Sequence, residues 1–275
     1  MSSNYIFPSI SHLVCGYDCT VSLPTALLLG KLETGTGTCL ISFKVYSEGA
    51  VCLEEKREIH FQNGTPVGLF DLTFHVTDHA KEWDGHGGFL EISISSANGD
   101  DIFSSQRPLG LYAIYSKAGK KSFFSDVSFR YASPPIIDQV ATFGKYVDTY
   151  PITHLDKAQN LGESVALINP YRMPLVARVQ THDDREIKRI KVPPESARYI
   201  PLDQILRDYE NEWIGQIQIT ASNRVVTYAI KHDLDDPSMI SDHEHMDPFR
   251  ADPTHLPFFQ LLRNKYGLMR RNMGF

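Results

Sequence analysis

The sequence lacks any long apolar run, and no stretch approaches the roughly 18–20 apolar residues of a membrane span. It begins "MSSNYIFPSISHLVCGYDC", which has neither a basic start nor a long apolar core, so it predicts no signal peptide. We therefore expect a cytoplasmic protein without a transmembrane segment. Cysteine is scarce too, with only Cys15, Cys19, Cys39 and Cys52. We expect free, mostly buried thiols, because a lone C-x3-C spacing does not supply the four ligands of a structural zinc site.

Basic residues are also in short supply, with 27 Lys and Arg against 33 Asp and Glu. The resulting net charge of −6 gives no indication of a nucleic-acid surface. The stretch "ETGTGTC" (33–39) lacks the third glycine and the following helix of a dinucleotide fingerprint. There is no G-x-S-x-G motif either. The motifs therefore leave open whether the protein is an enzyme.

What the sequence has in abundance is alternation of apolar and polar residues with period 2, which is typical of half-buried β-strands. Turn signals such as Asn63-Gly64, Asn98-Gly99 and Pro193-Pro194 separate these segments. Strands this short and this closely spaced favour sandwiches of antiparallel sheets. The predicted strands span 39–49, 57–61, 89–96, 111–116, 174–182, 186–192, 214–220 and 225–232.

Helical patterns are rare. The segment 201–210 could form two turns, and only 254–271 has a convincing amphipathic pattern. Pro257 suits a position in the first turn of that C-terminal helix. We expect this helix to cover an open end of its own domain; docking on an anionic membrane or in a partner's groove is the alternative.

An internal similarity links the two halves of the chain. "LYAIYSKAGKKSFFSDVSF" (111–129) aligns without a gap to "TYAIKHDLDDPSMISDHEH" (227–245) at an offset of 116. Upstream, Glu82-Trp83 matches Glu212-Trp213 at an offset of 130, and 58–72 resembles 189–202 in its strand–turn–strand rhythm. We interpret these blocks as two copies of one β unit, each burying its own tryptophan.

The predicted fold is all-β, with two tandem duplicated antiparallel β-sandwich domains, Ig-like or jelly-roll-like, and a C-terminal amphipathic helix. We place the first domain at 1–132, a linker at 133–146, the second domain at 147–250 and the C-terminal helix and tail at 251–275. Units of this length are of normal domain size. Such a fold does not by itself identify a function.

Histidines and acids gather in the hairpin of the second copy, where the first copy is basic and aromatic. Between Lys231 and Arg250 there are six acidic residues, three histidines and no basic residue. Alternation along a strand would place His243 and His245 on one face, and Asp242 and Glu244 on the other. The hypothesis is a site for one divalent ion, Zn²⁺, Fe²⁺ or Mn²⁺, held by ligands drawn from His243, His245, His232, Asp242 and Asp235. The alternative is a solvated acidic loop, neutralised by basic residues of the C-terminal tail.

Two functions therefore remain open. The first is a non-catalytic binding or assembly protein that acts on a macromolecular partner, either protein or carbohydrate. The second is a metal-dependent enzyme or metal-stabilised binder whose site is the 232–247 hairpin. The aromatic stretch "SFFSDVSFRY" (122–131) adds the idea of a sugar-binding platform, because flat rings stack on sugar faces. Free sheet edges would also allow a homodimer.

Overall fold

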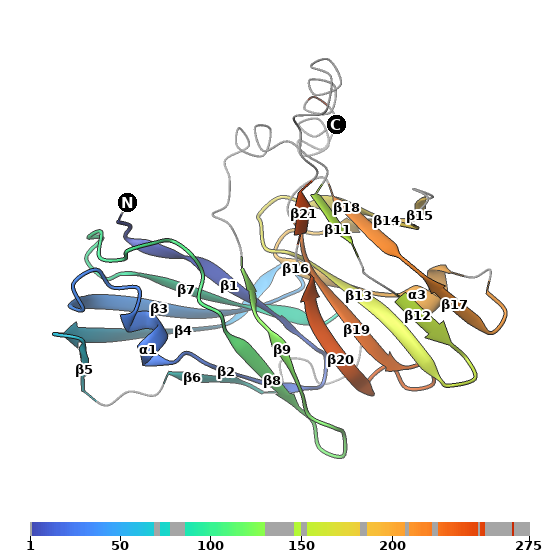
Figure 1. Ribbon diagram of the computed structural model, residues 1–275, viewed down its shortest axis with the longest axis horizontal. Helices are drawn as coiled ribbons and strands as arrows, with labels where there is room; N and C mark the ends of the chain where they lie inside the picture. Colours follow the sequence, from blue (N-terminus) through green and yellow to red (C-terminus); the bar gives the residue numbers. More distant parts are fainter. Residues whose placement is uncertain are drawn as a thin grey trace.

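The structure is a computed structural model that describes residues 2–68, 72–77, 86–129, 146–149, 153–181, 186–206, 209–221, 225–246, 248–250 and 266. It is nearly all β, with 61% strand and 5% helix. The strands form antiparallel sheets, two built from the first half of the chain and two from the second (Figure 1). The predicted all-β class with antiparallel sheets is confirmed.

The described residues of the first half form two sheets and one short helix, α1 (Thr25–Leu29). The larger sheet has the strand order β10-β1-β7-β3-β4-β5, and the smaller one has the order β6-β2-β8-β9. The strands of the larger sheet are β1 (Tyr5–Leu13), β3 (Gly37–Ser47), β4 (Ala50–Gln62), β5 (Thr65–Val67), β7 (Gly88–Ser96) and β10 (Ser128–Phe129). Those of the smaller sheet are β2 (Asp18–Ser22), β6 (Thr73–Val76), β8 (Tyr112–Ser116) and β9 (Phe123–Asp126).

These two sheets enclose a shared core. Phe43 of β3 stacks on Phe74 of β6, with ring centroids 4.4 Å apart and planes inclined by 9°. Alternation along β8 sends Ala113 and Tyr115 into this core and leaves Tyr112 and Ile114 outside. Apolar burial of this extent is the main stabilising contribution to such a two-layer unit.

The second half has two sheets and the one-turn helix α3 (Leu202–Ile205). One sheet has the order β15-β14-β18-β11-β21; the other has β17-β12-β13-β19-β20, with β16 also paired to β13. The first comprises β11 (Tyr146–Thr149), β14 (Leu175–Thr181), β15 (Glu186–Val192), β18 (Ile217–Ala221) and β21 (Pro248–Arg250). The second comprises β12 (Thr153–Asp156), β13 (Leu161–Asn169), β16 (Ser196–Pro201), β17 (Glu212–Gly215), β19 (Val226–Asp233) and β20 (Ile240–Met246).

The second pair of sheets also packs face to face. Val165 and Leu167 of β13 meet Ala177 and Val179 of β14 in one buried cluster. The opposite face of the β13–β19 sheet is covered as well, because Tyr228 and other residues on it join the core of the first half. The sheet that carries β19 and β20 is therefore buried between two hydrophobic clusters.

Strand for strand, the halves have the same connectivity. Nine strands of the first half have a counterpart in the second with the same order along the chain and the same neighbours. The pairs are β1/β11, β2/β13, β3/β14, β4/β15, β6/β16, β7/β18, β8/β19, β9/β20 and β10/β21. One part of the sequence alignment needs correction: 58–72 and 189–202 are not equivalent throughout, because β5 pairs with β4 whereas β16 pairs with β13.

Most of the predicted strands are present as strands in the structure, and 214–220 is divided between β17 and β18. The predicted helix at 201–210 shortens to the single turn α3. Trp213 lies on β17, only partly buried, and packs against the core of the second half. Trp83, residues 133–145 of the predicted linker and almost all of the C-terminal segment 251–275 lie outside the described residues.

None of the four cysteines forms a disulfide; Cys15, Cys19 and Cys39 are buried, whereas Cys52 is exposed. Burial raises the pKa of the Cys19 and Cys39 thiols to about 12. These thiols are therefore protonated and unreactive at neutral pH. None of the helices in the described part of the chain is long and apolar enough to cross a membrane.

Candidate functional site

The two halves meet at a pair of stacked, buried histidines. Nδ1 of His12 on β1 lies 3.0 Å from Nε2 of His243 on β20, and the two rings are 5.3 Å apart and inclined by 2°. Each side chain is about 1% exposed. Burial, followed by the nearby His12, holds the pKa of His243 well below its usual range. His243 is therefore neutral at pH 7, and it can hydrogen-bond to His12 without two like charges meeting.

The second predicted histidine lies on the same face of β20, as expected from alternation. The rings of His243 and His245 both contact the ring of Tyr228, at centroid distances of 4.8 and 5.6 Å. His245 also makes polar contacts with Asp126. Its amide donates to Oδ1 of Asp126 at 2.9 Å, and its Nδ1 lies 3.5 Å from Oδ2 of the same residue. These hydrogen bonds outweigh partial burial and lower the pKa of Asp126.

The edge strands β9 and β20 run side by side where the halves join (Figure 1). Each is the last strand of its sheet. The backbone amide of His245 on β20 donates a hydrogen bond to the carboxylate of Asp126 on β9. These two edges therefore face each other within one chain, and we do not expect them to pair with a second copy. Their junction forms an open groove of about 510 Å³, which we call the seam groove. It is lined by Tyr112, Ser122, Phe123, Phe124, Ser125, Asp126, Ser241, Asp242, His243, Glu244 and His245.

One wall of the seam groove is aromatic and open to solvent. Tyr112 is 62% exposed and Phe124 is 70% exposed, and their rings form an edge-to-face pair with centroids 6.2 Å apart. Ile114, which is 55% exposed, lies on the same face of β8. By contrast, Phe123 points inward and stacks on Tyr115. Large rings held in solvent next to a groove mark an interaction surface more often than a structural feature.

The other wall carries carboxylates. Asp242 lies 3.7 Å from Lys231 across the hairpin, and both side chains are more than 40% exposed. Glu244 is exposed on the same side of β20, which matches the predicted separation of these acids from the histidines. Together with Asp126, the groove offers three carboxylates, and no lysine or arginine is among the described residues that line it. His243 also lines the groove, and its Nδ1 has no hydrogen-bond partner in another described residue.

The remaining predicted metal ligands lie elsewhere. Nε2 of His232 is 2.6 Å from Oγ of Ser164, and its Nδ1 donates to the carbonyl of Asp233 at 2.8 Å. Burial lowers the pKa of His232, so this ring is also neutral at pH 7. It lines a separate cavity of about 270 Å³ with Tyr17 and Ile240.

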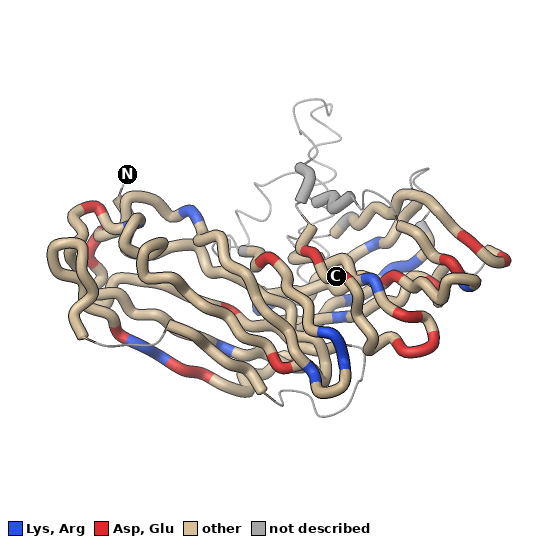
Figure 2. The backbone as a smooth tube through the Cα atoms, turned by 60° about the horizontal axis from the view of Figure 1, so that its bottom comes forward, with Lys and Arg blue, Asp and Glu red and all other residues tan. Residues whose placement is uncertain are grey.

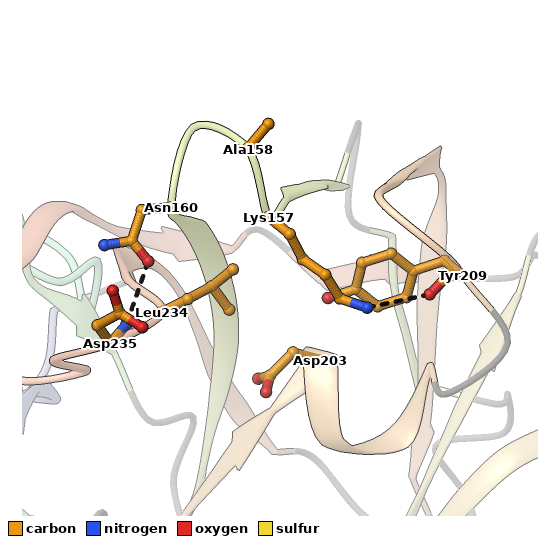
Figure 3. Close-up of a pocket in the computed structure, with 7 residues that line it drawn as sticks. All are labelled: Lys157, Ala158, Asn160, Asp203, Tyr209, Leu234 and Asp235. Atoms are coloured by element: carbon orange, nitrogen blue, oxygen red, sulfur yellow. Dashed lines mark hydrogen bonds between the residues drawn. The ribbon is translucent and has the colours of Figure 1, made fainter.

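Asp235 lies in a third cavity, of about 680 Å³, beside Asn160, Lys157 and Tyr209 (Figure 3). Its amide donates to the side-chain oxygen of Asn160 at 3.2 Å. Lys157 is anchored in the same cavity, because its Nζ lies over the Tyr209 ring at 4.6 Å and donates to the Tyr209 carbonyl at 3.3 Å. The five ligands predicted from the sequence are therefore divided among three cavities.

A different group of potential metal ligands does converge. Among the described residues, ligand atoms of His154, Asp156 and Glu212 lie within 4.8 Å of one another. The cross-strand pairing of β12 with β17 places Asp156 opposite Glu212. Nε2 of His154 is 2.9 Å from Glu212, and Oδ1 of Asp156 accepts from the amides of Ala158 and Gln159. None of the five predicted ligands belongs to this group, and the H-x-D spacing on β12, between β17 and β13, was not recognised in the sequence.

The acidic hairpin tip is neutralised by the other half of the chain. Lys120 of the β8–β9 hairpin forms an ion pair with Asp236, which also accepts from Ser238. These contacts lower the pKa of Asp236 to about 2. Lys120 and Asp236 are also aligned residues at the offset of 116, so the two hairpins meet tip to tip (Figure 2). The basic tail that the solvated-loop alternative names lies outside the described residues, and among the described residues the counter-charge to Asp236 is Lys120 of the first half's hairpin.

No family model matches the chain, and no curated protein matches it. Nine chains of solved structures do match. The Pleurotus ostreatus lectin, in its apo form, is 11% identical over 92% of this chain and 85% of its own, with a TM-score of 0.23. Two glycosyl hydrolase family 2 structures from Bacteroides cellulosilyticus are 12% and 11% identical, cover 86% and 88% of this chain, and have TM-scores of 0.16 and 0.15. This chain spans only 25% and 28% of those two proteins. Sequence identities and TM-scores this low do not indicate a function.

Proposed function

We propose that the protein is a non-catalytic carbohydrate-binding protein and that the seam groove is its binding site. The observation that carries this proposal is the pair of exposed rings, Tyr112 and Phe124, beside three carboxylates in one open groove. The C–H face of a pyranose ring stacks on an aromatic face, and carboxylate oxygens accept hydrogen bonds from sugar hydroxyl groups. An open groove with few apolar side chains suits a hydrated chain of sugars better than a buried small molecule.

The equivalent strand in the other half supports a binding role for this face. Tyr112-Ala113-Ile114 aligns with Tyr228-Ala229-Ile230, and in both triplets the alanine faces the core between the sheets of its own half. In the second half, Tyr228 and Ile230 are buried against the first half. In the first half, the matching tyrosine and isoleucine are exposed. The face that makes a protein contact in one half is thus free for a ligand in the other.

The test is a screen of the wild-type chain on an array of neutral, cationic and anionic oligosaccharides, followed by titration calorimetry with the best ligand. Tyr112→Ala and Phe124→Ala should each weaken binding, because each removes a stacking surface worth about 0.5–1.5 kcal/mol. That range corresponds to an affinity loss of about two- to tenfold for each ring. Both side chains are largely exposed, so the variants should fold normally.

Ile214→Ala is the matched control, because Ile214 is 60% exposed but lies on β17, outside the seam groove. It should leave the affinity unchanged. A wild-type chain that binds no oligosaccharide on the array would contradict the proposal. So would a ligand whose affinity is the same in the Tyr112→Ala/Phe124→Ala variant.

We also infer that the two halves are tandem duplicated β-sandwich domains derived from one ancestral unit. The shared connectivity of nine strand pairs supports this inference, as does the gapless hairpin alignment. A first domain expressed as 1–132 should then unfold cooperatively, although less stably than the full chain, because its contacts with Tyr228 and His243 are missing. Aggregation of that fragment without a cooperative transition would contradict the inference.

Metal binding is a second candidate, favoured by the convergence of His154, Asp156 and Glu212. Three protein ligands leave a fourth position of a zinc site for water. Calorimetric titration with Zn²⁺, Fe²⁺ and Mn²⁺ would test it, with His154→Ala/Glu212→Ala as the variant. The His243→Ala/His245→Ala variant tests the hairpin site predicted from the sequence. Loss of binding in only one of the two double variants identifies the site, and the absence of binding in the wild-type chain would eliminate both.

A further inference from the structure

We propose that the seam groove selects oligosaccharides that carry protonated amines and disfavours those that carry carboxylates. This inference rests on the proposed carbohydrate-binding function and specifies its ligand class. Three carboxylates line the groove, from Asp126, Asp242 and Glu244, and within the described part of the chain no lysine or arginine lines it. Its electrostatic field therefore attracts cations and repels uronates or other acidic sugars.

The acids differ in how strongly the protein already neutralises them. Asp126 is held by two contacts from His245. Asp242 has Lys231 at 3.7 Å, a long and exposed ion pair that contributes little stability. The exposed Glu244 has no ion pair with any described residue. Glu244 therefore offers the most available negative charge in the groove.

The aromatic wall favours the same ligand charge. A cation placed over the face of Tyr112 or Phe124 is attracted by the ring quadrupole. A protonated amino sugar can make both interactions. Its ring face can stack on an aromatic ring, and its ammonium group can lie close to a carboxylate. A neutral sugar can use only the stacking, and an acidic sugar meets repulsion from the opposite wall.

A basic peptide offers the same charge without the flat pyranose face. The exposed rings, at 62% and 70%, form an open platform and not an enclosed pocket for a lysine side chain. These features favour the sugar, and a lysine-rich peptide becomes one arm of the test.

The experiment compares four probes by titration calorimetry on the full chain: the glucosamine hexamer, the N-acetylglucosamine hexamer, a galacturonate hexamer and hexalysine. The pH is set low enough to protonate the glucosamine amines, and the salt concentration is low. We expect the glucosamine hexamer to bind about fivefold or more tightly than its acetylated form, as for one ion pair near a surface. The galacturonate hexamer should not bind, and added salt should reduce the difference between the first two probes.

Glu244→Gln should reduce the preference for the amine form about threefold or more. Its matched control is Glu33→Gln, an exposed acid far along the chain from the groove, which should leave the preference unchanged. Equal binding of the amine and acetylated hexamers would overturn this inference and leave the proposed function intact. Tighter binding of hexalysine than of any sugar would overturn both. A preference for glucosamine that survives in Glu244→Gln would overturn the assigned role of the carboxylates.

Discussion

The buried histidine pair makes the stability of the protein depend on pH in a direction that the structure fixes. His243 is enclosed by Tyr115, Phe123 and Tyr228, with His12 stacked on it. Its pKa in the folded chain is well below the value of about 6.5 that it has when unfolded. Below that pH the unfolded chain binds a proton that the folded chain excludes. The stability contributed by neutral His243 is therefore complete above pH 6.5 and is lost as the pH falls.

The size of this pH dependence follows from the difference in the number of protons bound by the unfolded and the folded chain. One proton taken up only by the unfolded chain lowers the free energy of unfolding by about 1.4 kcal/mol for each pH unit. His232 is also buried with a lowered pKa, so it adds a second contribution of the same sign. The wild-type slope between pH 6 and 5 should therefore be steeper than the contribution of His243 alone. Glu163 acts in the opposite direction near its own pKa, because burial raises that pKa.

The assay is urea unfolding at several pH values, with the free energy extrapolated to zero urea. His243→Phe keeps an aromatic ring in the cage but removes the titrating group, so the slope should fall by about 1.4 kcal/mol per unit. The variant should also lose about 1–3 kcal/mol at pH 8, because the buried hydrogen bond between Nδ1 of His12 and His243 is removed. His75→Phe, at an exposed position, is the control for removing a histidine. If the His243→Phe and wild-type curves run parallel from pH 7 to 5, the reasoning is refuted.

Three further substitutions can be followed by the same urea assay. Tyr228→Phe should cost about 1–3 kcal/mol, because its buried hydroxyl donates to a β1 carbonyl and accepts from a β10 amide; a neutral result would contradict this. Gly87→Ala should cost at least about 2 kcal/mol, because φ is +63° there and a Cβ would lie 2.0 Å from the carbonyl oxygen of Leu13. Lys120→Ala should cost no more than about 1 kcal/mol, since its ion pair with Asp236 is partly exposed, and a larger loss would show that the hairpin tips hold the halves together.

The sequence predicted strands in which apolar and polar residues alternate along the chain. Strand β8 alternates between exposed and buried positions, and its pattern was recognised. Strands β1 and β13 were not predicted, because nearly every residue in them is buried. A strand covered on both faces has no reason to alternate. These two strands lie where the halves pack on each other, which no local pattern reveals.

The site was foreseen only in part, for a similar reason. Alternation correctly placed His243 and His245 on one face, but the partner of His243 is His12, 231 residues away in the sequence. Residue spacing along the sequence cannot predict a contact between residues so far apart in the chain. The ion pair between Lys120 and Asp236 did leave a signal, because opposite charges occupy the same position of the aligned hairpins.

The most direct test of the account is a crystal structure of the full chain with the tightest-binding oligosaccharide from the array. We expect one sugar ring to lie flat on Phe124 or Tyr112, with a hydroxyl or amine within hydrogen-bond distance of Glu244 or Asp242. A sugar bound at another surface, with the seam groove empty, would contradict the account.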